Sequence, residues 1–160
     1  MPQYDARPVQ RAGRAVVRKT DLDAGRPPAR DLRDAVVLVD TVGDLATVYT
    51  GASAAFVGKS LVPLGGQNML EPAGLGCPVV FGPHTDNFIK ESRLLLENDA
   101  ALCVGDPAEL VDSLRRLLRD RPEAAAMGQR ARQVVVDNQG AAARNVKLVL
   151  HVLERKEAEL

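Results

Sequence analysis

Apolar residues are spread unevenly along the 160 residues of this chain, and their pattern changes near residue 35. Residues 1–34 are polar and rich in arginine, and within them only residues 14–18 (RAVVR) have the composition of a short strand. Residues 35–40 (AVVLVD) then form a continuous, mainly β-branched run, which is typical of a strand buried on both faces of a parallel sheet. The pattern predicts an irregular arginine-rich segment over residues 1–34 and a folded domain over residues 35–156.

Strand-like and helix-like segments alternate through the predicted domain. The expected elements are a helix at 43–50, a strand at 54–58, a loop at 61–68, a helix at 69–75, a strand at 77–82, a helix at 87–98, a strand at 100–104, and helices that begin at 106, near 122 and at 141. Asp106 followed by Pro107, with Glu109 three residues after the aspartate, is a capping-box pattern. The alternation predicts an α/β fold, a Rossmann-like, doubly wound parallel sheet with flanking helices. Ligands of such a sheet bind at the carboxyl ends of its strands, where Gly58 and Gly82 fall.

The composition narrows the classes of function. The 21 basic and 21 acidic residues cancel, so no overall field favours nucleic acid or an anionic membrane. Cys77 and Cys103 both lie in apolar surroundings, which predicts reduced core thiols in a cytoplasmic protein and no metal site. No apolar run approaches the roughly 20 residues of a membrane-spanning helix, so the membrane role that stays open is a peripheral one.

The tripeptide Gly58-Lys59-Ser60 matches the end of a phosphate-binding P-loop, but its neighbours contradict that interpretation. Residues 54–57 are apolar and suit a strand, and Leu61-Val62-Pro63 does not open a helix. A better phosphate candidate is Gly65-Gly66-Gln67-Asn68, just before the helix that carries Glu71. Glu71 could accept hydrogen bonds from both hydroxyls of a ribose. The alternative is a helix start with a favourable N-terminal acid and no ligand.

Three ordered segments of the sequence resemble one protein family. They are residues 40–45 (DTVGDL), 55–73 (AFVGKSLVPLGGQNMLEPA) and 76–88 (GCPVVFGPHTDNF). Together they resemble the C-terminal half of the bacterial 3-deoxy-D-manno-octulosonic acid (Kdo) transferases, and the similarity continues more weakly to about residue 153. Three segments in order and at matching spacing are far more specific than any single motif.

The resemblance implies a function and a set of site residues. Members of this family are inverting, metal-independent GT-B glycosyltransferases of lipopolysaccharide biosynthesis, whose C-terminal domain holds the donor CMP-Kdo and whose N-terminal domain holds a lipid A precursor. By resemblance, this chain is the donor-binding domain, with no metal and no cofactor besides the donor substrate. Glu71 would hold the ribose of CMP, and the other implied donor-site residues are Ser60, Gly65, Gly66, Gln67, Asn68, His84, Thr85 and Asn87. Lys59 and Gln67 depart from the commonest family pattern. Gln67 keeps a hydrogen-bond donor, and Lys59 is interpreted as a solvated residue at a strand end.

The resemblance also implies that catalysis needs residues outside this sequence. We expect an incomplete N-terminal part of the donor domain, no catalytic residue in this chain, and no activity without an acceptor domain that carries the general base. Two alternatives stay open: a donor domain for a UDP-sugar, and a non-enzymatic nucleotide-binding or scaffold module that self-associates through the exposed interdomain face. The expected location is the cytoplasm, with a peripheral position at the cytoplasmic face of the inner membrane.

Overall fold

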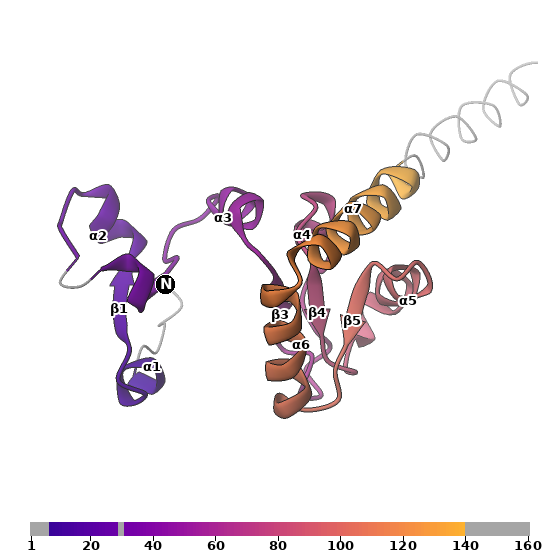
Figure 1. Ribbon diagram of the computed structural model, residues 1–160, viewed down its shortest axis with the longest axis horizontal. Coiled ribbons are helices and arrows are strands. Elements are labelled where there is room, and N and C mark those ends of the chain that lie inside the picture. Colours follow the sequence, from indigo (N-terminus) through magenta and orange to yellow (C-terminus); the bar gives the residue numbers. More distant parts are fainter. Residues whose placement is uncertain (1–6, 29–30, 140–160) are drawn as a thin grey trace, which may run out of the picture. The chain divides into compact units, whose positions relative to one another are not determined.

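A computed structural model describes residues 7–28 and 31–139 and divides the chain into an N-terminal unit, Met1–Val48, and a C-terminal unit, Tyr49–Leu160. Figure 1 labels most of the elements and colours them along the sequence. They are α1 (Arg7–Arg11), β1 (Ala15–Arg18), α2 (Lys19–Asp23), the 3-10 turn η1 (Leu32–Asp34), β2 (Ala35–Leu38), α3 (Leu45–Gly51), β3 (Ala55–Val57), α4 (Leu70–Gly74), β4 (Val79–Phe81), the 3-10 turn η2 (Asp86–Phe88), α5 (Ile89–Glu97), β5 (Ala101–Cys103), α6 (Pro107–Arg119) and α7 (Arg121–Asn138).

The C-terminal unit is built on a three-stranded parallel sheet in the order β3-β4-β5 (Figure 1). Val79 of the central strand lies opposite Ala55 on one side and Ala101 on the other. All three residues of β4 are buried, whereas β3 and β5 each leave one residue exposed. The central strand is covered on both faces and paired on both edges. Its burial therefore agrees fully with the prediction from its continuous apolar run.

Helices cover both faces of this sheet. Successive side chains of a strand point to opposite faces, so alternate residues of β4 enter two apolar layers. On one face Val79 and Phe81 pack with residues of α4, α5 and α7. On the other face Val80 packs with Leu117 of α6 and Met127 of α7. The predicted α/β fold, with parallel strands flanked by helices, is confirmed.

The start of α6 follows the predicted cap with one difference. Oδ1 of Asp106 accepts hydrogen bonds from the N–H groups of Ala108 and Glu109 at 2.8 and 2.9 Å. Oε2 of Glu109 accepts from the N–H of Gly105 at 2.6 Å, which is one residue earlier than a capping box requires. Both acids therefore satisfy backbone donors at the amino end of α6, where a negative charge is also favourable.

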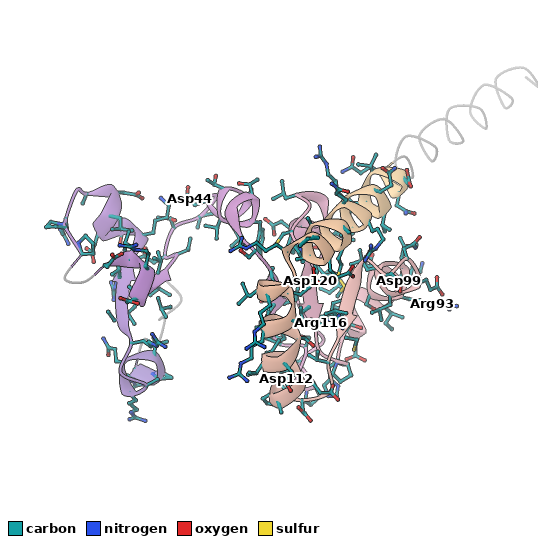
Figure 2. All side chains as sticks on the ribbon, in the orientation of Figure 1. Asp44, Arg93, Asp99, Asp112, Arg116 and Asp120 are labelled. Carbon is teal, nitrogen blue, oxygen red and sulfur yellow. The ribbon has the colours of Figure 1, made fainter. Side chains whose placement is uncertain are left out.

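Two close contacts fix α7 within the C-terminal unit. Nε of Arg130 donates to the backbone carbonyl of Asp99 at 2.7 Å. Asp99 lies in the turn between α5 and β5 (Figure 2). A Cβ atom built at Gly128 would overlap the backbone carbonyl of Gly76, so α7 packs directly against the turn that precedes β4. Glycine is therefore required at this point of the helix for steric reasons.

The N-terminal unit contains a separate sheet of two parallel strands, β1 and β2, with Ala15 opposite Ala35. The strands expected at residues 14–18 and 35–40 are confirmed. The expectation that the second of them is buried on both faces in the sheet of the domain is wrong, because Val36 and Val37 are both exposed. A run of β-branched residues indicates that a strand can be buried, but burial also requires a covering layer. The described residues of this unit provide no such layer over β2.

The two cysteines differ in environment. Cys77 is buried, and burial raises the pKa of its thiol. Cys103 is exposed, which corrects the expectation of two core thiols, because it is the last residue of an edge strand. The helix expected over residues 141–156 lies outside the described residues, so the predicted domain limits of 1–34 and 35–156 stay predictions.

Candidate functional site

The predicted site residues follow β3 and β4, at the carboxyl ends of two adjacent parallel strands. Ser60 joins the two loops. Its Oγ donates to the carbonyl of Val57 at 2.5 Å and accepts from the N–H of Gly82 at 2.8 Å, and its carbonyl accepts from the N–H of His84 at 2.9 Å. Ser60 is buried. In this structure its side chain therefore holds the loops together rather than facing solvent.

The Gly-Lys-Ser tripeptide does not begin a helix. Residues 58–63 form turns, and Lys59 is exposed with a φ of +62°. A P-loop requires the tripeptide to open directly into a helix whose amide groups face the phosphates. The prediction that these residues are not a P-loop is confirmed.

A pair of glycines brings the first loop against the second. Gly65 and Gly66 are buried and have φ values of +79° and +73°, in the left-handed region that favours glycine. The carbonyl of Gly65 accepts from the N–H of Asn87 at 3.1 Å, and the N–H of Gly66 donates to the carbonyl of Lys59 at 3.2 Å. A Cβ atom at Gly65 would overlap the Asn87 side chain, and one at Gly66 would lie 3.2 Å from the His84 carbonyl oxygen. Glycine at both positions permits this close approach.

The residues that follow the glycines present polar side chains to solvent. Gln67, Asn68 and Glu71 are all exposed, and Glu71 lies in the first turn of α4, as predicted. Oδ1 of Asn68 accepts from the N–H of Leu70, the first residue of α4, at 3.0 Å, although the N-cap position itself is Met69. Because α4 has only five residues, it aligns few peptide dipoles, and the attraction of its amino end for an anion is small.

Two hydroxyl groups position the second loop. Oγ1 of Thr85 lies 3.0 Å from Oγ of Ser92, and Ser92 donates its own proton to the carbonyl of Ile89 at 3.1 Å. Thr85 is therefore the donor in the hydroxyl pair. His84 and Thr85 are half-buried, and Asn87 is exposed. The sequence patterns did not single out Ser92, because a serine inside a helix carries no distinctive signal.

Tyr49 has a polar group that the hydrophobic pattern did not single out, because the pattern treated Tyr49 as one of the apolar positions of a helix. It is half-buried, and its burial raises the pKa of its phenol above the usual value. The negative charge of Glu71 raises the pKa of Tyr49 further. Burial and this charge therefore both favour the neutral phenol.

A cavity of about 350 Å³ lies elsewhere in the C-terminal unit. Its lining includes Ser53, Gly76 and Pro78, which precede β3 and β4, and also Leu117 and Arg121. None of the predicted donor-site residues lines it. The cavity is at the amino ends of the strands, whereas ligands of parallel α/β sheets bind at the carboxyl ends.

Two further features bear on function: clusters of metal ligands and membrane-spanning helices. Within residues 7–28 and 31–139, no group of three or more histidine, cysteine or acidic side chains is placed to hold a metal ion. In the same part of the chain, none of the helices has both the length and the apolar character needed to cross a membrane.

The fold and a match to a family model together define the class of this protein. The family model described as Glycosyl transferase-like matches residues 63–149, which is more than half of the chain and includes the glycine pair and Glu71. The chain belongs to this glycosyl transferase-like family, and its α/β architecture is of the C-terminal GT-B type.

Within this class, the chain is similar to 3-deoxy-D-manno-octulosonic acid transferases. It is 36% identical to that of Haemophilus influenzae over 121 residues, which cover 75% of this chain and 28% of the relative. It is also 36% identical to that of Bordetella pertussis over 139 residues, which cover 86% of this chain and 31% of the relative. The chain thus spans less than a third of the length of these curated relatives.

A solved structure agrees with the sequence relatives. The C-terminal CMP-Kdo binding domain of WaaA from Acinetobacter baumannii matches with a TM-score of 0.67 and 27% identity, over 79% of this chain and 63% of that domain. The resemblance inferred from three sequence segments is therefore confirmed.

Proposed function

We propose that this chain binds CMP-Kdo as the donor domain of a glycosyltransferase that transfers Kdo to a lipid A precursor in lipopolysaccharide biosynthesis. The observation that carries the proposal is the pair of joined loops after β3 and β4, which present exposed Gln67, Glu71 and Asn87 at the carboxyl ends of parallel strands. The similarity to a CMP-Kdo binding domain supports this choice of donor. The acceptor site and its general base are assigned to a second domain outside these residues.

Glu71 is assigned to the ribose of the donor. No hydrogen bond from a described residue engages its carboxylate, so both oxygens are available to the ribose hydroxyls. The backbone N–H groups of Gly66, His84 and Asn87 are already bonded to carbonyls of the loops. Contacts with the phosphate are therefore assigned to the amide side chains of Gln67 and Asn87, and the two glycines let the second loop, which carries Asn87, approach the first.

Calorimetric titration of CMP into the 160-residue chain, up to millimolar concentration, tests the proposal. Glu71→Ala should weaken CMP binding about tenfold or more, because it removes hydrogen bonds to a charged acceptor. Asp112→Ala is the matched control: Asp112 is also an exposed carboxylate, but it belongs to α6 (Figure 2) and is not among the predicted donor-site residues. The control should bind CMP within about twofold of the parent, because surface changes away from such features have small effects.

The same titration separates CMP from the alternatives. Preference for UDP over CMP would replace the Kdo donor with a UDP-sugar, since both are pyrimidine nucleotides and the phosphate and sugar contacts must discriminate. A folded chain with no response to CMP or UDP would reject the donor function. Unfolding of Glu71→Ala, monitored by circular dichroism, would instead support a purely structural role at the start of α4.

The proposed acceptor also sets the location. A lipid A precursor is a membrane lipid and a nucleotide sugar is soluble, so the donor domain is proposed to lie in the cytoplasm, peripheral to the inner membrane. Sedimentation with lipid vesicles, compared between the isolated chain and a two-domain enzyme, would measure how much of this attachment belongs to the donor domain.

A further inference from the structure

Lys59 has a backbone conformation that few lysines adopt. Its φ is +62°, in the left-handed region where a residue with a Cβ atom is strained and glycine is not. Strain of this kind is concentrated at functional sites, so an observed case is a reason to look for a function. The interpretation of Lys59 as a solvated residue at a strand end accounts for its exposure but not for its strained backbone.

The backbone at Lys59 is held within the first loop. Its carbonyl accepts a hydrogen bond from the N–H of Gly66 at 3.2 Å. The next residue, Ser60, is buried, and its side chain is bonded to both Val57 and Gly82. Lys59 therefore extends an exposed side chain from a fixed point at the carboxyl end of β3. Because the backbone is already fixed, only the lysine side chain has to be ordered when a ligand binds.

The side chain of Gln67 lies against the residue that precedes Lys59. A Cβ atom built at Gly58 would lie 3.3 Å from Oε1 of Gln67. The amide of Gln67 is one of the two groups assigned above to the phosphate of the donor. The four-carbon stem of Lys59 starts one residue from this contact, so its ammonium can reach the same phosphate.

The other charges of the two loops are unfavourable for an anionic ligand. In residues 58–71 and 82–88 the acidic side chains are Glu71 and Asp86, and both are exposed. Lys59 is the one lysine or arginine in these two segments. Among the residues that the structure describes, no acidic side chain forms an ion pair with it. A phosphate here approaches two carboxylates, and the ammonium of Lys59 is the charge that offsets them.

We propose that the ammonium of Lys59 contacts the phosphate of the CMP donor and contributes to the selection of a negatively charged nucleotide. The inference rests on the proposed function, because it concerns the same site. It adds a cation to a set of donor-site residues that otherwise holds amides, hydroxyls, a histidine and a carboxylate. The strained φ of Lys59 is then a loss of stability that accompanies a gain in binding.

Calorimetric titration of CMP into the 160-residue chain and into variants at Lys59 tests the proposal. Lys59→Gln removes the charge and should weaken CMP binding about fivefold, as expected for a partly solvated ion pair. Lys59→Arg keeps the charge and should bind CMP within about twofold of the parent. Added sodium chloride should weaken binding to the parent more steeply than binding to Lys59→Gln, because salt screens the interaction that the variant lacks. Loss of a purely structural residue would not change this salt dependence.

Lys59→Gly separates binding from stability. Glycine adopts a φ of +62° without strain, so this variant should unfold at the same temperature as the parent or at a higher one. It should nevertheless bind CMP as weakly as Lys59→Gln. Circular dichroism during heating gives the first comparison, and calorimetry gives the second.

A charge on another element provides the matched control. Arg132 is exposed on α7 and is not among the predicted donor-site residues, so Arg132→Gln also removes one positive charge from the surface. It should bind CMP within about twofold of the parent, because the charge that it removes belongs to neither loop.

Three results would overturn the proposal while the proposed function stands. The first is CMP binding by Lys59→Gln and Lys59→Gly that equals binding by the parent. The second is an equal loss of binding in Arg132→Gln and Lys59→Gln, which would indicate an effect of net charge. The third is weak binding by Lys59→Gln with the salt dependence of the parent, which would make the role of Lys59 structural. A folded parent chain that binds no CMP would instead reject the proposed function, and this inference with it.

Discussion

Both hydrogen-bonding functions of the Ser60 hydroxyl are used within the fold. It donates to the end of β3 and accepts from the N–H of Gly82 just after β4, so one side chain sets the spacing of the two loops that carry the candidate site. The sequence resemblance implied a contact with the donor. In the structure, Ser60 instead holds together the two loops that carry the exposed site residues.

Ser60→Ala tests this positioning role. Without the hydroxyl, the N–H of buried Gly82 loses its partner, which should cost about 1–3 kcal/mol in the free energy of unfolding. Ser53→Ala, at an exposed serine just before β3, should change it by less than about 0.5 kcal/mol. Urea denaturation followed by circular dichroism compares the two. Equal, small effects would mean that Gly82 finds another acceptor and that the link is dispensable.

Gly65→Ala and Gly76→Ala form a second pair at the residue scale. Both glycines have nearly the same φ, +79° and +77°, so an alanine at either position would carry a similar backbone strain of about 1 kcal/mol. A Cβ atom at Gly65 would overlap Asn87, whereas the nearest atom to one at Gly76 is 3.8 Å away. We expect Gly65→Ala to cost more stability and to weaken CMP binding, and Gly76→Ala to leave binding intact. Equal binding by both variants would contradict the assigned contact between the loops.

The residues of the site were partly predictable for identifiable reasons. The close backbone approach at Gly65 and Gly66 could be predicted because glycine tolerates it, and the position of Glu71 in the first turn of a helix because the sequence pattern marks that helix start, whereas their contacts with a donor stay predictions. Ser92 could not be placed, because its contact with Thr85 depends on where α5 brings a single hydroxyl. A sequence period locates a helix, but it does not show which polar atom meets another loop.

At the scale of elements, sequence patterns predicted the existence of strands better than their burial. The apolar runs of β2, β3, β4 and β5 look alike. Among the strands that the structure describes, however, β4 alone is buried throughout, because it alone has a described strand on each side and helices on each face. The burial of a strand depends on the strands and helices next to it. These neighbours are set by the order of strands in the sheet rather than by the composition of the strand itself.

Helix α7 gives a prediction in which packing opposes helix propensity. Alanine normally stabilises a helix relative to glycine by about 1 kcal/mol, so Gly128→Ala would be expected to help. Because a Cβ atom at Gly128 would overlap the Gly76 carbonyl, we expect it instead to destabilise the fold by about 1–3 kcal/mol. Ala125→Gly, at an exposed position of the same helix, should cost about 1 kcal/mol through propensity alone. A stabilised Gly128→Ala in thermal unfolding would show that α7 can move away from the turn.

At the scale of the whole molecule, the two units differ in how much they bury. Fully buried side chains such as Met69, Phe81 and Leu95 all belong to the C-terminal unit, and the described residues of the N-terminal unit include none. Because burial of apolar surface is the main favourable term in folding, most of the stability of the chain is expected to reside in the C-terminal unit.

Hydrogen exchange of the free chain, followed by mass spectrometry, measures this difference directly. Amides of β1 and β2 should exchange within a small factor of the unfolded rate, because opening a two-stranded sheet with no buried residue costs little free energy. Amides of β4 should exchange only through global unfolding of the C-terminal unit, since both their neighbours in the sheet must separate first. Added urea should therefore speed the exchange of residues 79–81 steeply and leave that of residues 35–38 nearly unchanged. Comparable protection of β2 and β4 in the free chain would contradict this difference and would mean that β2 is covered in solution.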